Sequence, residues 1–556
     1  MKQGYHPIKF IFILIALLSP YKALSHTPFF DISLSEFLLK NSSAIISQIH
    51  SESGLAYESL KYQLIRLGCS SEQLTSQKIK DINTPFELRK NLTELFANCD
   101  KRENPPKNIF ESLKNKDVYL VLAGESLKSP MSYFGHSMIL FLDQNDFYFS
   151  PVLSVLAKTD ELTPFEEIIK GGFSEIEAQV NFIPFHQIID YYNNQESREL
   201  RLIKLPPDEF DKEKLIQHFE KLSNRDIKYN FFTQNCSTYI YEALESSCNC
   251  LDHGPHIITP ISIEKKIYEI SYNHNKFELN SLFSRFHEHY NELSNKEKSI
   301  VKGYYEGDIP PKKYNHDVEQ SAILASRLSF NTYGKPNSTY SNILNTFGYD
   351  SFLLQSPPSH SKPVDSSLDS TNISSAKLTL FEAGVSLKLS AVDFNHHEQR
   401  QQRNISSKLS VASIEIYQQS GETKIHSIDA LDIRAINPID FVSQKASWRL
   451  KVGAEENPQQ ELKGLISFAI GAATQINKAK LYILPSVEIS ESSSFPVYAG
   501  IQYKTSLFSI DYTSKDFKDH SLSIFRRENS SFGYELNASK EKDSSTSFKA
   551  TLALYF

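Results

Sequence analysis

The chain has 556 residues, which is too long for one ordinary domain and predicts about three. Its formal net charge of −7 gives no electrostatic reason to expect a nucleic-acid partner. Hydrophobic residues make up 40% of the chain, which is enough to form packed cores.

Residues 1–25 have the pattern of a secretory signal peptide. Lys2 and Lys9 precede an apolar run from Phe10 to Leu18, and Ala23-Leu-Ser25 has the small-x-small pattern of a cleavage site. The alternative is a retained membrane anchor, but the apolar run is shorter than the roughly 20 residues that a spanning helix needs. We therefore expect an exported protein.

The rest of the chain divides into five segments by its hydrophobic pattern. Apolar residues have helical spacing in 86–96 and 318–328, whereas Val118–Ala123 is a continuous apolar run typical of a buried strand. In chain order we expect a helical N-terminal region (26–115), an α+β domain (116–270), a helical connector (271–355), a Ser/Pro-rich linker (356–375) and a domain of antiparallel strands (376–556).

The last segment alternates apolar and polar residues with the period of a β-strand, in about ten to twelve runs separated by polar turns. In the final run, one face of the strand carries apolar residues: Phe548, Ala550, Leu552, Leu554 and Phe556. A soluble β-sandwich would bury such a face, whereas a transmembrane barrel would show it to lipid. We favour an outer-membrane barrel, because the chain is exported and its terminal Phe resembles the ending of bacterial outer-membrane proteins.

His136 begins an apolar segment that we expect to be a central strand. The run from Ser137 to Leu142 is apolar on both faces, like Val118–Ala123, and a Tyr-Phe-Gly turn precedes it. A histidine at the mouth of a strand can serve as a catalytic base. The alternative is a core histidine with one backbone partner.

Cys236 lies at the first turn of a predicted helix. Ile240, Ala243 and Leu244 give that helix one buried stripe, and Asn235 precedes the cysteine. Unpaired N–H groups and the helix dipole stabilise a thiolate at this position. We expect the side chain to be at least half exposed. The alternative is a small buried hydrophobic residue.

Six short motifs follow one another from about residue 117 to residue 265. In order they are Tyr119-Leu-Val-Leu, Ser129-Pro-Met-Ser-Tyr-Phe-Gly-His136, Lys170-Gly-Gly-Phe173, Tyr191-Tyr-Asn-Asn-Gln-Glu-Ser-Arg-Glu199, Phe231-Phe-Thr-Gln-Asn-Cys-Ser237 and Thr259-Pro-Ile261. Together they resemble the N-terminal periplasmic domain of the Lnb-type lipoprotein N-acyltransferases. The arrangement is also similar to circularly permuted NlpC-type papain-like domains, in which the histidine precedes the cysteine.

The resemblance implies a fold and a site. The fold class is α+β: a helical N-terminal segment, a permuted NlpC/papain-like domain and a C-terminal antiparallel β-barrel of outer-membrane type. Cys236 is implied as the nucleophile and His136 as its base. The protein is expected in the periplasm, anchored in the outer membrane by the barrel, and neither a cofactor nor a metal is expected.

The implied activity is acyl transfer through a thioester, from a phospholipid to the amine of a lipoprotein or a related acceptor. The membrane is the expected partner, and no nucleic acid is expected. Three alternatives remain: a peptidoglycan amidase or endopeptidase of the NlpC type, a lipid hydrolase, and a non-enzymatic outer-membrane scaffold. The aromatic surroundings of Cys236, such as Phe231 and Tyr239, favour lipid over cell wall.

A third catalytic residue is harder to choose. Tyr148 and Ser150 are placed on the next strand, but a one-residue slip in the preceding turn would reverse the face on which they lie. Asn235 has two interpretations, an oxyanion donor or the N-cap of the Cys236 helix, and capping is the more common role.

The five cysteines leave one unpaired if the others form disulfides. If Cys236 is the free one, Cys69 pairs with Cys99 across a predicted helical hairpin. The remaining segment, C-x-C-x2-H-x2-H, contains Cys248, Cys250, His253 and His256. A zinc site is an alternative there, although the spacing is cramped for a tetrahedral centre.

Overall fold

The computed structural model describes residues 109–555 with gaps. The gaps are 125–134, 144–146, 160–161, 163–165, 167–169, 172–173, 232, 252–257, 271–275, 334–341, 344–345, 347–374, 382–383, 395–405, 420, 443–445, 457–460, 477–478, 491–492, 506–507, 528–531 and 541–545. The expected signal peptide, residues 26–108 of the helical region (with Cys69 and Cys99), residues 356–374 of the linker and Phe556 lie outside the described residues.

Seven antiparallel strands form the sheet of the α+β domain, in the order β6-β4-β3-β2-β1-β5-β7. Their bounds are β1 Asp117–Ala123, β2 His136–Leu142, β3 Pro151–Ala157, β4 Ile176–Pro184, β5 Leu200–Lys204, β6 Ile227–Tyr229 and β7 Lys276–Leu279. The two continuous apolar runs are β1 and β2. They pair side by side at the centre of the sheet and are almost completely buried, as their composition predicts.

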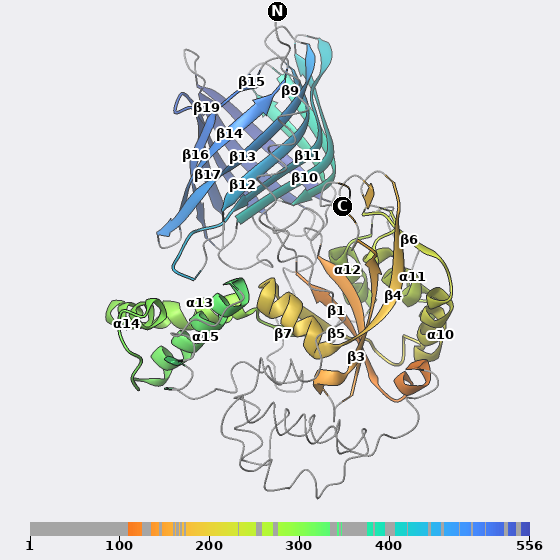
Figure 1. The fold of residues 1–556 in the computed structure, drawn as a ribbon. Coiled ribbons are helices and arrows are strands. Elements are labelled where there is room, and N and C mark those ends of the chain that lie inside the picture. Colours follow the sequence, from red (N-terminus) through yellow and green to blue (C-terminus); the bar gives the residue numbers. More distant parts are fainter. Residues whose placement is uncertain are drawn as a thin grey trace, which may run out of the picture.

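Short helices cover this sheet and connect its strands (Figure 1). They are η2 Ile109–Leu113, η4 Phe147–Phe149, α9 Phe185–Ile188, the π-helix η5 Ile189–Gln195, α10 Lys212–Ser223, α11 Cys236–Ser247 and α12 Pro260–Ile270. Ile240 and Leu244 of α11 join Phe219 of α10 in one core with Leu120 and Ile139 of the central strands. The predicted stripe of α11 is therefore the face that packs on the sheet.

Within its described residues up to Tyr333, the expected helical connector has three helices and one strand. The helices are α13 Leu282–Glu292, α14 Asn295–Glu306 and α15 His316–Tyr333, and we call these three the helical strut. The strand, β7, pairs with β5 at the edge of the sheet. The sheet thus extends past residue 270, further than the hydrophobic pattern indicated, because a four-residue edge strand is too short to show a clear period.

The C-terminal part is a closed antiparallel barrel of twelve strands, with the two-residue β15 added to β14. Its strands are β8 Ser375–Phe381, β9 Gly384–Phe394, β10 Ser406–Gln419, β11 Glu422–Ile436, β12 Ser447–Glu456, β13 Leu462–Ile476, β14 Ala479–Ile489, β15 Ser493–Ser494, β16 Val497–Lys504, β17 Ser509–Lys515, β18 Asp519–Arg527, β19 Phe532–Lys540 and β20 Ser547–Tyr555. The first strand, β8, pairs with the last, β20, and the ring is complete through β13 and β14.

The barrel has apolar side chains outside and charged side chains inside. Leu380 is 58% exposed and Phe548 is 61% exposed, on the face that a sandwich would bury. Asp393 and Asp429 are buried in the interior, where Lys377 and Lys388 pair with them at 2.5 and 3.1 Å. This polarity confirms the outer-membrane barrel and excludes the sandwich. Among the helices of the described residues, none is long and apolar enough to cross a membrane.

Candidate active site

Gly135 directs the chain into β2 so that His136 lies at the start of a central strand. Its φ of +87° is a conformation that other residues rarely adopt. A Cβ atom at this position would lie 2.7 Å from the carbonyl oxygen of Ala123. Glycine therefore permits β2 to approach β1 closely where His136 is paired with Ala123.

The imidazole of His136 is held by a hydroxyl and an aromatic ring. Its Nε2 atom lies 2.8 Å from Oγ of Ser154, a fully buried residue of β3. Tyr192 of the π-helix η5 stacks on the imidazole, with ring centroids 5.8 Å apart. The guanidinium of Arg198 lies 4.7 Å from the centroid of the same tyrosine ring. These contacts restrict the rotation of His136.

Cys236 is the first residue of α11, as its sequence context predicts. The preceding Asn235 caps the helix: its side-chain oxygen accepts from the Thr238 N–H at 3.0 Å. The Asn235 amide donates to the carbonyl oxygens of Phe231 and Ile258, at 3.1 and 3.0 Å. This arrangement corresponds to the capping interpretation of Asn235 rather than to oxyanion binding.

A pair of serine hydroxyls joins the strand of the histidine to the helix of the cysteine. Oγ of Ser137 lies 2.9 Å from Oγ of Ser237, and both side chains are fully buried. Since each serine directly follows one member of the pair, the contact brings His136 and Cys236 together. Cys236 itself is only 4% exposed, so the expectation of a half-exposed thiol was wrong. The first turn of α11 packs under β2 instead of projecting from the domain.

The surroundings of the Cys236 thiol favour its ionised form. Burial opposes ionisation and is the largest single influence on its pKa. The charge and hydrogen bond of His136, the backbone N–H of Ser137 and the hydroxyl of Tyr229 together outweigh burial and lower the pKa of Cys236 to about 6. The thiol is therefore largely ionised at neutral pH.

Two residues that the sequence analysis did not single out contact the pair: Ser154 contacts His136, and Tyr229 contacts Cys236. Ser154 was detectable as the one polar side chain inside the apolar run from Pro151 to Ala157. Tyr229 lies in the three-residue strand β6, which has no periodicity to recognise. Burial, followed by the negative charge of Cys236, raises the pKa of Tyr229 well above its usual value, so its hydroxyl remains a proton donor.

Tyr148 and Ser150 do not lie on the strand that faces His136, so this expectation needs correction. Both belong to the turn before β3, which begins at Pro151. The Ser150 hydroxyl accepts the N–H of Asp143 at 2.9 Å, and the Tyr148 carbonyl oxygen lies 3.1 Å from Nδ1 of His186. The turn is longer than the sequence suggested, and β3 therefore presents Ser154 to the histidine instead.

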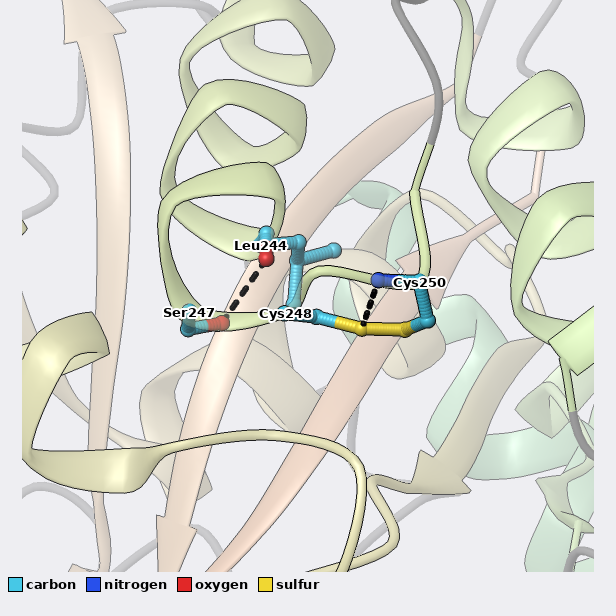
Figure 2. Close-up of a disulfide and its surroundings, with 4 residues drawn as sticks. All are labelled: Leu244, Ser247, Cys248 and Cys250. Carbon is cyan, nitrogen blue, oxygen red and sulfur yellow. Dashed lines mark hydrogen bonds between the residues drawn. A yellow bond between two sulfur atoms is a disulfide. The ribbon is translucent and has the colours of Figure 1, made fainter.

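Cys248 and Cys250 form a disulfide directly after the last residue of α11 (Figure 2). Beside it, the Ser247 hydroxyl donates to the carbonyl oxygen of Leu244 at 2.8 Å. The disulfide removes the two thiolates that a zinc site would need, while His253 and His256 lie outside the described residues. Among the described cysteines, Cys236 is the free one.

Two family models match separate parts of the chain. Residues 106–264 match the family model of the Lnb N-terminal periplasmic domain, and residues 405–504, within the barrel, match a domain of unknown function, DUF7840. No curated protein matches the chain. A solved KdgM porin covers 33% of this chain and 98% of its own length, with 10% identity and a TM-score of 0.23. Outer membrane phospholipase A from Escherichia coli covers 35% of this chain and 95% of its own length, with 7% identity and a TM-score of 0.21.

The family match and the barrel agree on where the protein acts. The matched family is a periplasmic domain, and the closed barrel has an apolar outer surface of the kind that faces lipid. The expected location, in the periplasm with an outer-membrane anchor, is confirmed. Residues 106–264 are thus similar to the Lnb N-terminal periplasmic domain, as the six motifs of that segment predict.

Proposed function

We propose that this protein is a cysteine-dependent acyltransferase that works through a thioester on Cys236. The observation that carries the proposal is the buried pair of Cys236 and His136, in which the thiol has a pKa of about 6. A thiolate at a helix N-terminus beside a fixed imidazole is a nucleophile with its acid–base partner. The family match supports a role related to lipoprotein N-acylation.

In the first half-reaction the thiolate sulfur attacks the carbonyl carbon of a lipid ester. Since Nε2 of His136 contacts Ser154, Nδ1 is the ring nitrogen left to exchange protons at the site. The tetrahedral oxyanion accepts hydrogen bonds from the free N–H groups at the start of α11 and from Tyr229. The bond to the glycerol oxygen then breaks, and the imidazolium of His136 protonates that oxygen. The products are an acyl thioester on Cys236 and a lysolipid.

In the second half-reaction an amine resolves the thioester. The amine nitrogen attacks the carbonyl carbon, and the neutral imidazole of His136 takes a proton from it. The carbon–sulfur bond breaks, which leaves an amide product and restores the thiolate and imidazolium. Water in place of the amine would make the same site a lipid hydrolase.

The barrel supports lipid as the acyl donor. A domain tied to an outer-membrane barrel works beside the inner leaflet, where ester-linked acyl chains are concentrated. A cell-wall amide lies further from this surface, and this difference favours the acyltransferase over the peptidoglycan amidase.

The experiment is capture of the acyl group. Purified protein is incubated with a phospholipid that carries a mass-labelled acyl chain, and the peptide containing Cys236 is analysed by mass spectrometry before and after hydroxylamine, which cleaves thioesters. We expect a labelled, hydroxylamine-sensitive adduct on Cys236. Addition of a diacylglyceryl peptide with a free N-terminal amine should discharge the adduct and yield the labelled amide.

Two variants and a matched control complete the design. Cys236→Ala should abolish capture and His136→Ala should reduce it strongly, whereas Ser150→Ala, in the turn outside the site, should leave it unchanged. Discharge by water alone would identify a hydrolase. Cleavage of muropeptides without any lipid adduct would contradict the proposal in favour of the amidase.

A further inference from the structure

One periplasmic loop of the barrel leaves the rim and packs against the helical strut. The described part of this loop, residues 437–442 between β11 and β12, is called the docking loop here. Its base is fixed to the barrel: the Asn437 N–H donates to the Ser447 hydroxyl, and the Ile439 N–H donates to the Ala473 carbonyl oxygen, both at 2.8 Å. These hydrogen bonds hold the base of the docking loop to the neighbouring strands of the barrel.

The tip of the docking loop lies among aromatic side chains of α13 and α14. The Phe441 ring lies 5.8 Å from Phe286, 5.3 Å from Tyr290 and 5.2 Å from Tyr305, measured between centroids. Val442 is buried in the same cluster, together with Leu324 and Leu328 of α15.

A polar contact lies beside the aromatic one. The Asp440 carboxylate is 3.2 Å from Nε2 of His287 on α13. The docking loop thus meets the strut through both apolar and polar groups, which fixes the orientation of the loop on the strut.

The opposite side of the strut is attached to the α+β domain close to the candidate site. The Ser284 hydroxyl of α13 donates to Oε1 of the Glu199 side chain at 3.0 Å. The Glu199 carbonyl oxygen in turn accepts the N–H of Gly124, directly after β1. Helices α13 and α15 also contact η5, the π-helix that carries Tyr192 against His136.

The helical strut therefore contacts both the barrel and the α+β domain, and in Figure 1 it lies below the barrel and beside that domain. It lies outside the segment that matches the periplasmic-domain family, which ends at residue 264, and outside the DUF7840 match, which begins at residue 405. Loss of this contact would loosen the attachment of the α+β domain to the barrel, and the orientation of the domain to the membrane would vary more.

We propose that Phe441 is a positioning residue, and that the docking loop and the helical strut hold the Cys236 site at the periplasmic rim of the barrel. In this arrangement the site acts on acyl chains in the inner leaflet of the membrane that contains its own barrel. The inference rests on the proposed function and adds to it the physical source of the acyl donor. A rigid attachment raises the rate on that donor through orientation and effective concentration, and leaves the chemistry at Cys236 unchanged.

The test compares two substrates in proteoliposomes that contain the full chain. One is a labelled phospholipid in the same vesicle, and the other is a water-soluble short-chain thioester. Phe441→Ala should lower acyl capture from the vesicle lipid about tenfold and leave the rate on the soluble thioester within about twofold. Phe441→Leu should retain most of the vesicle activity, because it keeps an apolar contact.

Ile439→Ala is the matched control, since Ile439 lies on the same loop but is 42% exposed and outside the aromatic cluster. This variant should behave as wild type on both substrates. Heat-dependent gel migration of each variant verifies that its barrel is assembled. Equal capture by Phe441→Ala and wild type would overturn the inference. A parallel loss on both substrates would also overturn it, since the residue would then support the fold of the site.

Hydrogen exchange separates this inference from the proposed function. Phe441→Ala should increase exchange in α13 and α15 together with the docking loop, whether or not the protein transfers acyl groups. Unchanged protection of these helices would show that the contact does not hold the domains together and would overturn the inference by itself. If the wild type forms no adduct on Cys236 with either substrate, the proposed function fails, whereas hydrogen exchange still decides whether Phe441 holds the two parts of the protein together.

Discussion

The low pKa of Cys236 can be measured directly through the reactivity of its thiol. The perturbation is His136→Ala, which removes the charge and the hydrogen bond that oppose the effect of burial. Without them, only the Ser137 N–H and the Tyr229 hydroxyl oppose burial, so the pKa of the thiol should rise towards its ordinary value of 9.0. The two proteins should therefore differ in the pH at which their alkylation rates rise.

The size of the difference depends on the pH chosen. At pH 5.5 a thiol with a pKa of about 6 is about one-quarter ionised, whereas a thiol with a pKa of about 9 is about 0.03% ionised. The more acidic thiolate is also about 15- to 30-fold less nucleophilic, from a Brønsted coefficient of about 0.4–0.5. These two factors leave wild type about 25- to 50-fold faster than His136→Ala at pH 5.5. At pH 7 the advantage shrinks to about 3- to 6-fold, so acidic pH discriminates best.

The assay is the second-order rate of iodoacetamide alkylation at Cys236, followed by mass spectrometry from pH 4.5 to 9.5. The disulfide of Cys248 and Cys250 protects those two sulfurs, and the peptide masses separate the adduct on Cys236 from any on Cys69 or Cys99. We expect the wild-type rate to level off above pH 7 and the His136→Ala rate to rise through pH 9. A wild-type rate that still increases through pH 9 would refute the reasoning, because Cys236 would then be an ordinary buried thiol.

Three further predictions follow from single contacts. Ser154→Ala removes the hydroxyl that contacts Nε2 of His136. The loss of this one hydrogen bond should lower kcat about tenfold and change KM by no more than about twofold. An unchanged kcat would contradict a positioning role for Ser154. Gly135→Ala places a Cβ atom on a residue with φ +87°, 2.7 Å from a backbone oxygen. Calorimetry should therefore show a thermal midpoint of the α+β domain that is lower by about 4 °C or more. An unaltered midpoint would show that the alanine is not strained. Arg434 of β11 and Asp511 of β17 form an ion pair across the barrel, so that side chains fill its interior. The protein should therefore show no steady conductance in planar bilayers. A stable ohmic current would contradict a filled interior.

The parts of the fold that the sequence predicted are those with a long, regular pattern. Apolar runs on both faces identified β1 and β2, and the alternation ending in Leu552 and Leu554 identified lipid-facing strands. Membrane location was predicted for the same reason. The start of α11 at Cys236 was predicted because a capping residue precedes an amphipathic run.

The parts that were missed depend on contacts between distant segments. Ser154 rather than Tyr148 or Ser150 faces His136, because the turn before β3 has a length that no local pattern reports. The burial of Cys236 depends on the serine contact between β2 and α11, one hundred residues apart. Phe441 belongs to the barrel by sequence, and its packing on the helical strut exists only in the assembled chain.

The most direct test of the account is the mass of the Cys236 peptide after incubation with a mass-labelled phospholipid. The account predicts one acyl group on Cys236 that hydroxylamine removes and that an amine acceptor converts to an amide, with no such adduct in Cys236→Ala. A wild-type peptide that remains unmodified in vesicles with an assembled barrel and abundant lipid would contradict it.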